Sequence, residues 1–435
     1  MEDTSDGTLR YLVRPSLDAG EDEGVATVLH AVREHLGMDV AFVAEFRTTD
    51  RVFRHVNAKT RSPVGQGDAV PLEVGYCQRV VDGRLPQLIP DASAIPAAAA
   101  LPETQAIPIG SHLSVPIRFR DGRLYGTFCC FSFEPDATLG ERDLRMMKVL
   151  AEILAERIEQ DTRTNRDRTQ RVEVLREMMD RGQPSIVYQP IYDLVSGGMA
   201  GVEALSRFNS TPPRSPDVWF AEAAAIDLGP TLEGRAIQAA LGHLDELPQG
   251  VYVAVNGSPE LILSGALQKT LEAVDLGRVV LEITEHASVT DYQALTAALA
   301  PLRSLGLRIA IDDTGAGYAS MRHILSVEPD LVKLDISLTR GIDADRKRRA
   351  LATALIAFAR ETGMGVIAEG VETAAELNTL RKLGVTRVQG FHLARPMPLG
   401  SLAGALRPPE AQPNQPDEVR DSRRKAMKTF SGTGS

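Results

Sequence analysis

The sequence is poor in cysteine and in aromatic residues. Its 435 residues include 3 cysteines and 1 tryptophan, and aromatic residues make up only 5% of the chain. Cys77, Cys129 and Cys130 have neither the even number nor the spacing of a disulfide framework or a zinc site. We therefore expect a reducing compartment, the cytoplasm, and cysteines that pack as small apolar side chains.

Long apolar runs and an excess of positive charge are also missing. No stretch approaches the roughly 20 apolar residues that span a bilayer, and the first residues, MEDTSDGT, are acidic and polar. The formal net charge is −10. These features argue against a membrane segment and against a broad surface for polymeric nucleic acid, but they allow a small phosphorylated ligand.

The first third of the chain has the pattern of an α+β domain. A stretch of helical period at 24–38 precedes four strand-like runs, AFVAEF, RVFRHV, HLSVPIRF and LYGTFCCFSF. The Pro- and Ala-rich segment 90–102 is expected to be a loop. From Leu139 the helical period returns and continues into a highly charged stretch, which either faces a partner helix or is a solvated spacer beyond residue 160.

The rest of the chain predicts an α/β domain and a tail. An α/β barrel takes roughly 250 residues, so the length suits two domains. We expect the α+β domain over 20–160, a helical linker over 161–183 and the α/β domain over 184–405. The segment 406–435 is rich in Pro, Gln, Ser and charge, and is expected to be disordered.

Polar residues close one Val/Ile/Leu-rich run after another between residues 186 and 400. Short runs separated by amphipathic helical stretches are typical of βα units around a parallel sheet. The closing residues are Glu203, Asn256, Glu282, Asp312, Asp313, Lys333, Glu369 and Gln389. One such residue could be a capped structural group, but the ends of many parallel strands converge on one rim, where the repulsion between acids must be neutralised. Bound divalent cations would do this.

The tandem Asp312 and Asp313 indicate phosphoryl chemistry. At the end of a strand both can reach one site, and one carboxylate can bridge two metals about 3.5–4 Å apart. Carboxylate and amide oxygens without Cys or His suit Mg²⁺ or Mn²⁺ better than zinc. Lys333 could orient or deprotonate the attacking water, or could neutralise charge as a structural ion pair.

Taken together, these runs resemble the EAL domain family of cyclic di-GMP phosphodiesterases. The family tripeptide stands at Glu203, Ala204 and Leu205, within a longer match from YQPIYDL through GVEALSRF, VAVNGS, LEITE, IDDTGAGYAS, DLVKLD, VIAEGVET and QGFHLARPMP. The resemblance implies a modified (β/α)8, TIM-like barrel that hydrolyses cyclic di-GMP to linear pGpG.

The resemblance also assigns roles to single residues. It implies that Glu203, Asn256, Glu282 and Asp312 hold one metal, and that Asp312, Asp313 and Glu369 hold the other. Lys333 and Gln389 would position the water, so that Lys333, Glu369, Gln389 and Glu203 form the catalytic set. Gln189, Leu205, Arg207 and Asp335 would contact the substrate, Arg207 because its planar fork can donate two bonds to a phosphate.

One loop departs from the family pattern. The usual DDFGTGYSS is replaced here by Asp312 to Ser320, DDTGAGYAS, in which Thr314, Ala316 and Ala319 are the changed residues. In the family this loop couples dimer contacts to the metal site, and Glu285 matches the residue that tethers it. Because all the inferred ligands remain, we expect a change in regulation rather than a loss of activity.

The first domain resembles a GAF sensory domain by its layout. This implies an unidentified small-molecule or protein signal, transmitted to the barrel through the long helix, and a homodimer. Two alternatives remain for the barrel: a catalytically silent cyclic di-GMP receptor that signals through protein contacts, and a lyase or racemase of the enolase kind. If the enzyme assignment is right, Glu203→Ala or Lys333→Ala should abolish turnover without unfolding the chain.

Overall fold

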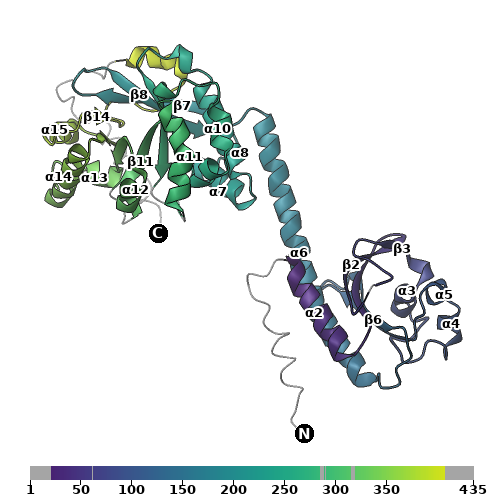
Figure 1. The fold of residues 1–435 in the computed structure, drawn as a ribbon. Coiled ribbons are helices and arrows are strands. Elements are labelled where there is room, and N and C mark those ends of the chain that lie inside the picture. Colours follow the sequence, from purple (N-terminus) through teal and green to yellow (C-terminus); the bar gives the residue numbers. More distant parts are fainter. Residues whose placement is uncertain (1–20, 61, 285–288, 290, 315–318, 407–435) are drawn as a thin grey trace, which may run out of the picture. The chain divides into compact units, whose positions relative to one another are not determined.

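The computed structural model of the protein describes residues 21–60, 62–284, 289, 291–314 and 319–406. The chain divides into two compact units, and the division falls after Thr169, inside one long helix (Figure 1). In the described ranges, no helix is both long enough and apolar enough to cross a membrane. Nearly all of the predicted tail at 406–435 lies outside the described residues.

The first unit is built on a six-stranded antiparallel sheet in the order β3-β2-β1-β6-β5-β4. Its elements are α2 (Glu21–His35), β1 (Val40–Phe46), β2 (Asp50–Ala58), β3 (Ala69–Pro71), η1 (Leu72–Val74), α3 (Tyr76–Val81), β4 (Leu88–Ile89), α4 (Pro96–Ala99), α5 (Pro102–Ala106), β5 (Ser111–Arg118), β6 (Leu124–Ser132) and α6 (Glu141–Asp180).

Both faces of this sheet are covered, and successive residues of β6 serve opposite faces. Phe128 and Cys130 pack with α2 and the first half of α6, whereas Cys129 and Phe131 pack with α3 and the segment around α4. The α+β prediction and the four long strands are confirmed. The prediction of a loop over 90–102 is wrong in part, because one-turn helices start at Pro96 and Pro102, where proline fits the first helical position.

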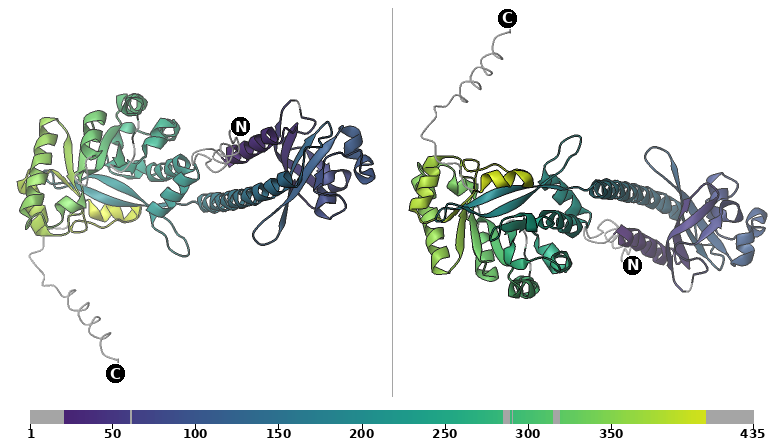
Figure 2. Two further views of the ribbon diagram at one scale, coloured as in Figure 1. Left: turned by 90° about the horizontal axis from the view of Figure 1, so that it is seen from below. Right: turned by 90° about the horizontal axis from the view of Figure 1, so that it is seen from above.

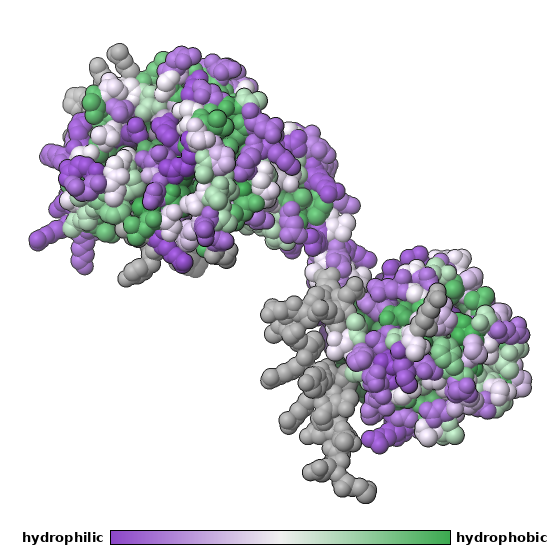
Figure 3. Space-filling model, viewed as in Figure 1, coloured by the Kyte–Doolittle hydropathy of each residue, from purple (hydrophilic) through white to green (hydrophobic). Residues whose placement is uncertain are grey.

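Helix α6 is continuous over its 40 residues. Its first half is anchored in the first unit's core, but residues 162–171 are polar and exposed in the single chain, and Figure 3 shows mainly hydrophilic residues along this stretch. The exposed apolar residues of the helix are Val149, Ile153 and Val174, which lie before and after that stretch. The middle of α6 therefore has the composition of a solvated spacer.

The second unit is a closed eight-stranded barrel in the order β10-β11-β12-β13-β14-β7-β8-β9 (Figure 2). Its strands are β7 (Ser185–Asp193), β8 (Met199–Arg207), β9 (Tyr252–Asn256), β10 (Val279–Thr284), β11 (Arg308–Thr314), β12 (Leu331–Leu334), β13 (Gly365–Ala368) and β14 (Arg387–Val388). Its helices are α7 (Pro216–Ala225), α8 (Gly229–Leu241), η2 (Leu244–Glu246), α9 (Pro259–Leu263), α10 (Ala266–Leu271), η3 (Leu276–Arg278), α11 (Tyr292–Ser304), α12 (Ala319–Val327), α13 (Ile336–Thr339), α14 (Arg346–Glu361), α15 (Ala374–Lys382) and η4 (Leu399–Ala405).

One strand of the barrel runs against the others. β7 pairs antiparallel with both β8 and β14, while the remaining neighbours pair in parallel. The short connection over residues 194–198 turns β7 back into β8 as a hairpin, so these two strands need no crossover helix of the kind that joins parallel strands. The predicted modified (β/α)8 barrel is confirmed.

The end of α6 packs on the barrel through a small separate core. Leu175, Met178 and Met179 lie against Trp219 of α7, and the Trp219 ring stacks on Phe208 with centroids 5.6 Å apart. Trp219 is only 4% exposed, so it has the packing role of a core residue. This core ties the last turns of α6 to the second unit.

Removal of one side chain from this core should loosen that attachment. Leu175 is 2% exposed, so Leu175→Ala should lower the unfolding free energy of the second unit by about 2 to 5 kcal/mol. Trp219 is the only tryptophan in the sequence, so its fluorescence during urea unfolding measures the effect locally. The exposed Val174→Ala on the same helix is the matched control, and an equal loss in both variants would contradict the packing argument.

Candidate functional site

The strand period directs the predicted site residues into one end of the barrel. Side chains two positions apart on a strand share a face. The apolar inner layer includes Ala254, Val280, Ala310, Leu331 and Ile367, and the residues two positions later are Asn256, Glu282, Asp312, Lys333 and Glu369. On the reversed strand β7, Gln189 lies two positions before the inner residue Ile191. The polar residues therefore form the next layer, at the carboxyl ends of the parallel strands.

Lys333 is the centre of this layer. Its Nζ lies 2.7 Å from Glu369 Oε1, 2.8 Å from Glu282 Oε2, 3.1 Å from Asp312 Oδ1 and 3.7 Å from Glu203 Oε1. The lysine and Glu282 are buried, and the other three acids are nearly so. Four carboxylates from four strands thus share one ammonium group.

The charge balance of this cluster is negative. Burial alone would lower the pKa of Lys333, but the surrounding carboxylates outweigh it and hold that pKa well above its usual value. Burial raises the pKa of Glu282 well above its usual value, and raises the pKa of Glu369 to about 8 although Lys333 counteracts it. One ammonium group does not compensate four buried acids, so the cluster favours additional positive charge.

A hydrogen-bonded pair of glutamines borders the cluster. The Gln389 side-chain N–H group donates to Gln189 Oε1 at 3.0 Å and also to Glu203 Oε2. Gln189 in turn donates to the backbone carbonyl of Ala394 at 3.1 Å. Because Gln189 and Glu203 are paired across β7 and β8, the reversed strand directly positions one carboxylate of the cluster.

Two cavities meet at Leu205. One, of about 290 Å³, is lined by Gln189, Glu203, Asp312, Asp335, Glu369 and Gln389, and the other, of about 520 Å³, is lined by Arg207 and Asn256. Leu205 lines both. The structure thus brings most of the predicted catalytic and substrate-contacting residues to one cavity, while Asn256 and Arg207 face the adjoining one. Lys333 and Glu282 lie beneath, in the buried layer.

Some predicted residues have a further role or fall outside the described ranges. Asp335 caps helix α13, where its carboxylate accepts from the Ser337 N–H group at 2.8 Å. Thr314, in the changed loop, is buried, and its hydroxyl donates to the Ile311 carbonyl at 3.4 Å. Glu285, residues 315–318 and the side chains of Asp313 and Ala319 lie outside the described part of the chain.

The cavities also contain residues that the sequence interpretation did not select. Glu233 of α8 lines the larger cavity and accepts from the Ser258 N–H group at 2.8 Å, and burial raises its pKa. Phe220 lies in the same cavity, and Phe391, 50% exposed, lines the smaller one. Glu233 is on a helix without any strand-end pattern, but Phe391 lies two residues after Gln389 and could have been found as an exposed aromatic in a polar motif.

The donor set of the cluster suits a hard divalent cation. Its ligand atoms would be carboxylate oxygens, and Glu282 Oε1 is a buried oxygen that has no hydrogen-bond partner in the described part of the chain. Within the described residues, no group of three or more His, Cys, Asp or Glu side chains is arranged to hold a metal ion. The geometry gives the reason, because four of the acids point toward the Lys333 ammonium group.

Each of the two units matches the model of a known protein family. The model of the EAL domain matches residues 172–396, and the model of the GAF domain matches residues 18–159. Two relatives from Pseudomonas aeruginosa are similar in the EAL region. The cyclic di-GMP phosphodiesterase NbdA is 32% identical over 249 residues, which cover 54% of this chain and 32% of that protein. The bifunctional diguanylate cyclase/cyclic di-GMP phosphodiesterase MucR is 29% identical over 247 residues, covering 53% and 36%.

The relatives are longer proteins with other regions. The chain spans about a third of the length of these curated relatives. Among solved structures, the EAL enzyme Bd1971, in a form with bound cAMP and cyclic di-GMP, is 19% identical with a TM-score of 0.51. The alignment covers 85% of this chain and 93% of that one, so this likeness extends to the overall fold of most of the chain.

Proposed function

Since the chain belongs to the EAL domain family, we propose that its barrel hydrolyses cyclic di-GMP to linear pGpG with two divalent cations, Mg²⁺ or Mn²⁺. The observation that carries the proposal is the cluster of four carboxylates around Lys333, opening into a cavity that adjoins Arg207. The activity stated in the names of NbdA and MucR supports the same substrate.

Glu203, Asn256, Glu282, Asp312, Asp313 and Glu369 would hold the cations. Bound there, these would lower the pKa of an attacking water and stabilise charge on the attacked phosphate. The acids would turn their oxygens away from Lys333, which remains a hydrogen-bond donor beneath the site. Such an exchange of partners is favoured by the excess negative charge and by the buried Glu282 oxygen, which has no partner within the described ranges.

The other residues would bind and orient the substrate. Gln389 donates from one amide group to both Gln189 and Glu203, so it can keep a water beside the carboxylate in line for attack. Leu205, at the junction of the two cavities, allows one ligand to extend from the acids to Arg207. Asp335, on the rim of the smaller cavity, would complete the contacts.

The direct test is incubation of the purified protein with cyclic di-GMP and either Mg²⁺ or Mn²⁺, followed by chromatography of the products. Formation of pGpG that is abolished by a chelator is the expected result. Binding of cyclic di-GMP without product would instead support the silent receptor, and would direct attention to the changed loop from Thr314 to Ala319. If the protein neither binds cyclic di-GMP nor forms product, cyclic di-GMP is not its substrate.

Arg207 provides a test of the substrate position. Its guanidinium lines the larger cavity, and its Nη1 donates to the Ser206 carbonyl at 2.8 Å, so other N–H groups can reach a phosphate. We expect Arg207→Lys to raise KM by about tenfold with a smaller change in kcat, since the paired donation is lost but one charge remains. The exposed Arg381→Lys on α15 is the control, and an unchanged KM in Arg207→Lys would remove the residue from the substrate site.

The first unit would regulate the barrel in response to a signal, and the active form would be a homodimer in the cytoplasm. The continuous helix α6, which has one end in the core of each unit, supports this proposal. Phosphodiesterase assays of the full chain and of residues 170–435, together with light scattering, would test it. Equal rates in both proteins would argue against control by the first unit.

A further inference from the structure

A fully buried arginine lies in the first unit, on the face of the sheet covered by α3. Arg51 of β2 forms an ion pair with Glu103 of α5, and its Nε and Nη1 have no hydrogen-bond partner among the residues that the structure describes. The Arg51 side chain is 1% exposed and that of Glu103 is 13% exposed. A guanidinium held away from water with two unused donors favours a second negative charge nearby.

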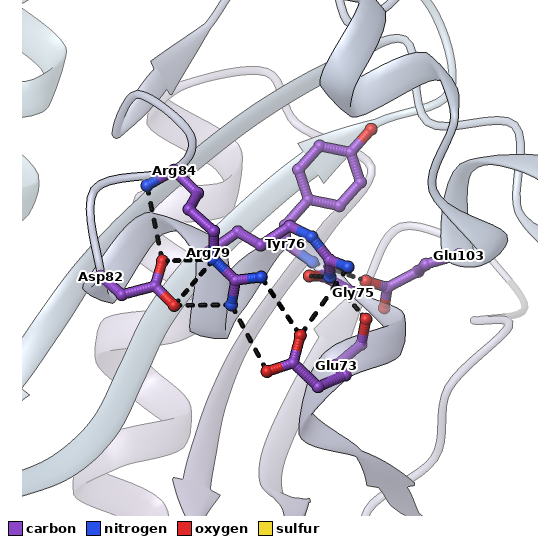
Figure 4. A network of polar contacts seen from close by, with 7 residues as sticks. All are labelled: Glu73, Gly75, Tyr76, Arg79, Asp82, Arg84 and Glu103. Carbon is purple, nitrogen blue, oxygen red and sulfur yellow. Dashed lines mark hydrogen bonds and ion pairs between the residues drawn. The ribbon is translucent and has the colours of Figure 1, made fainter.

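The start of α3 is held by Glu103, the ion-pair partner of Arg51, and Figure 4 shows Glu103 beside Gly75 and Tyr76. The Tyr76 N–H group donates to the Glu103 carboxylate at 3.0 Å, and Arg79 donates to the Gly75 carbonyl at 2.9 Å. Gly75 allows this approach, because a Cβ there would overlap both the Arg51 guanidinium and the Glu103 carboxylate. The residue after Tyr76 is therefore held at a defined place over the sheet.

That residue is Cys77, and it faces a second cysteine. Its Sγ lies 3.6 Å from Sγ of Cys129 on β6, and Cys129 also contacts the Ser114 hydroxyl at 3.1 Å. A disulfide has a sulfur–sulfur distance of about 2.05 Å, so bonding would require an approach of roughly 1.5 Å. Cys130 points to the opposite face of the sheet and packs with α2 and α6, so it is excluded from this pair.

The surroundings make the two thiols unequal. Burial raises the pKa of Cys77, but the hydrogen bond with Cys129 and the Arg51 charge outweigh it and lower that pKa to about 7. Burial and the contact with Cys77 raise the pKa of Cys129 well above its usual value. Tyr76 stacks on His112, and burial raises the pKa of Tyr76. His112 is neutral, since burial and Arg51 lower its pKa to about 3. Cys77 is thus the thiol that loses its proton more readily and can act as the nucleophile, whereas Cys129 stays protonated and donates a hydrogen bond.

We propose that Cys77 and Cys129 are a peroxide-reactive pair that closes to a disulfide, a function separate from the one proposed for the barrel. The Cys77 thiolate attacks one oxygen of a peroxide, the O–O bond breaks, and the other oxygen takes a proton and leaves as water or an alcohol. The sulfur of Cys129 then attacks the Cys77 sulfenic acid. The S–O bond breaks, and hydroxide leaves with the Cys129 proton as water. The two sulfurs supply the two electrons that reduce the peroxide.

The space beside the sulfur restricts the reactant to a small molecule. Arg51, Cys77, Glu103 and His112 line a cavity of about 10 Å³. This is about the room that one water needs, so a nucleotide, a haem or a tetrapyrrole does not fit without rebuilding the core. Glu103 is the more exposed partner of the Arg51 ion pair, so movement of the one-turn helix α5 is the shortest way to admit hydrogen peroxide.

The test is mass spectrometry of the full-length protein. The reduced protein is treated with hydrogen peroxide, denatured in the presence of N-ethylmaleimide, which alkylates free thiols, and digested. We expect a Cys77–Cys129 linked peptide that lacks two hydrogen atoms, and free, alkylated Cys130. Cys129→Ser should retain Cys77 as a sulfenic acid that dimedone traps, whereas Cys77→Ser should lower peroxide consumption by about tenfold or more.

Matched variants separate this chemistry from general oxidation. Cys130→Ser removes a cysteine that lies next to Cys129 on β6 and is as fully buried, and it should leave the linked peptide unchanged. The Glu103 charge raises the pKa of Cys77, so Glu103→Gln should shift the pH profile of disulfide formation, centred near pH 7 in the wild type, to lower pH. Alkylated, unlinked Cys77 after peroxide treatment would overturn the proposal, as would an equal loss of reaction in Cys130→Ser. None of these measurements depends on hydrolysis of cyclic di-GMP.

Discussion

Glu203→Ala should lower kcat for cyclic di-GMP hydrolysis by more than about a hundredfold, because loss of even an outer-shell partner of a metal ligand costs about 10- to 100-fold. Glu203 combines two positions in the site. Its carboxylate is within ion-pair distance of Lys333 and accepts from Gln389, and it lines the cavity at the carboxyl ends of the strands. The variant therefore removes a proposed cation ligand and the acceptor that orients Gln389.

Stability should change little in this variant. Glu203 is one of four acids that compete for one ammonium group, so its removal lessens the repulsion while the other three still pair with Lys333. Product chromatography measures turnover, and Trp219 fluorescence during heating measures the melting of the barrel. The control is Glu361→Ala at the exposed end of α14. Activity of Glu203→Ala close to that of the wild type would exclude the residue from catalysis.

The sequence predicts the strands and the polar layer because both depend on local period. Side chains two apart on a strand share a face, so a run such as VVLEIT places Val280 inside the barrel and Glu282 above it. The pattern also predicts that strand ends meet. It fails for Glu203 as a strand end, since β8 continues to Arg207, where its pairing with the antiparallel β7 extends the strand. Nothing in the run itself reports that extra pairing.

The position of Lys333 at the centre of the acids could not be predicted from its own segment. Its contacts come from four other strands, and their distances depend on barrel closure and relative register. The same holds for Cys77 and Cys129, which are 52 residues apart in sequence. Sequence alone predicted packing roles for both cysteines, because the helix that carries Cys77 is six residues long and its place over the sheet depends on Glu103.

The same geometry changes what we expect from Lys333. The sequence suggested that Lys333→Ala would abolish turnover without unfolding. The lysine lies at the centre of four buried acids, so we expect Lys333→Met, which keeps the length of the side chain, to abolish turnover. Without metal, the variant should also destabilise the barrel by about 3 to 5 kcal/mol, which is the range for a buried ion pair that loses one partner. Urea unfolding in a chelator, followed by Trp219 fluorescence, measures this loss.

Divalent cations should then restore more stability to the variant than they add to the wild type. In Lys333→Met the four acids no longer pair with an ammonium group, so a bound Mn²⁺ or Mg²⁺ replaces the missing positive charge without breaking an ion pair. A cation at about 100 times its Kd stabilises the folded protein by about 2.7 kcal/mol. Lys382→Met, on the exposed surface of α15, is the matched control and should behave as the wild type. The contrary result is that Lys333→Met has the unfolding free energy of the wild type in chelator and is stabilised no more than the wild type by cations. The four carboxylates would then not depend on the lysine for neutralisation, and the charge argument for the cation site would have to be abandoned.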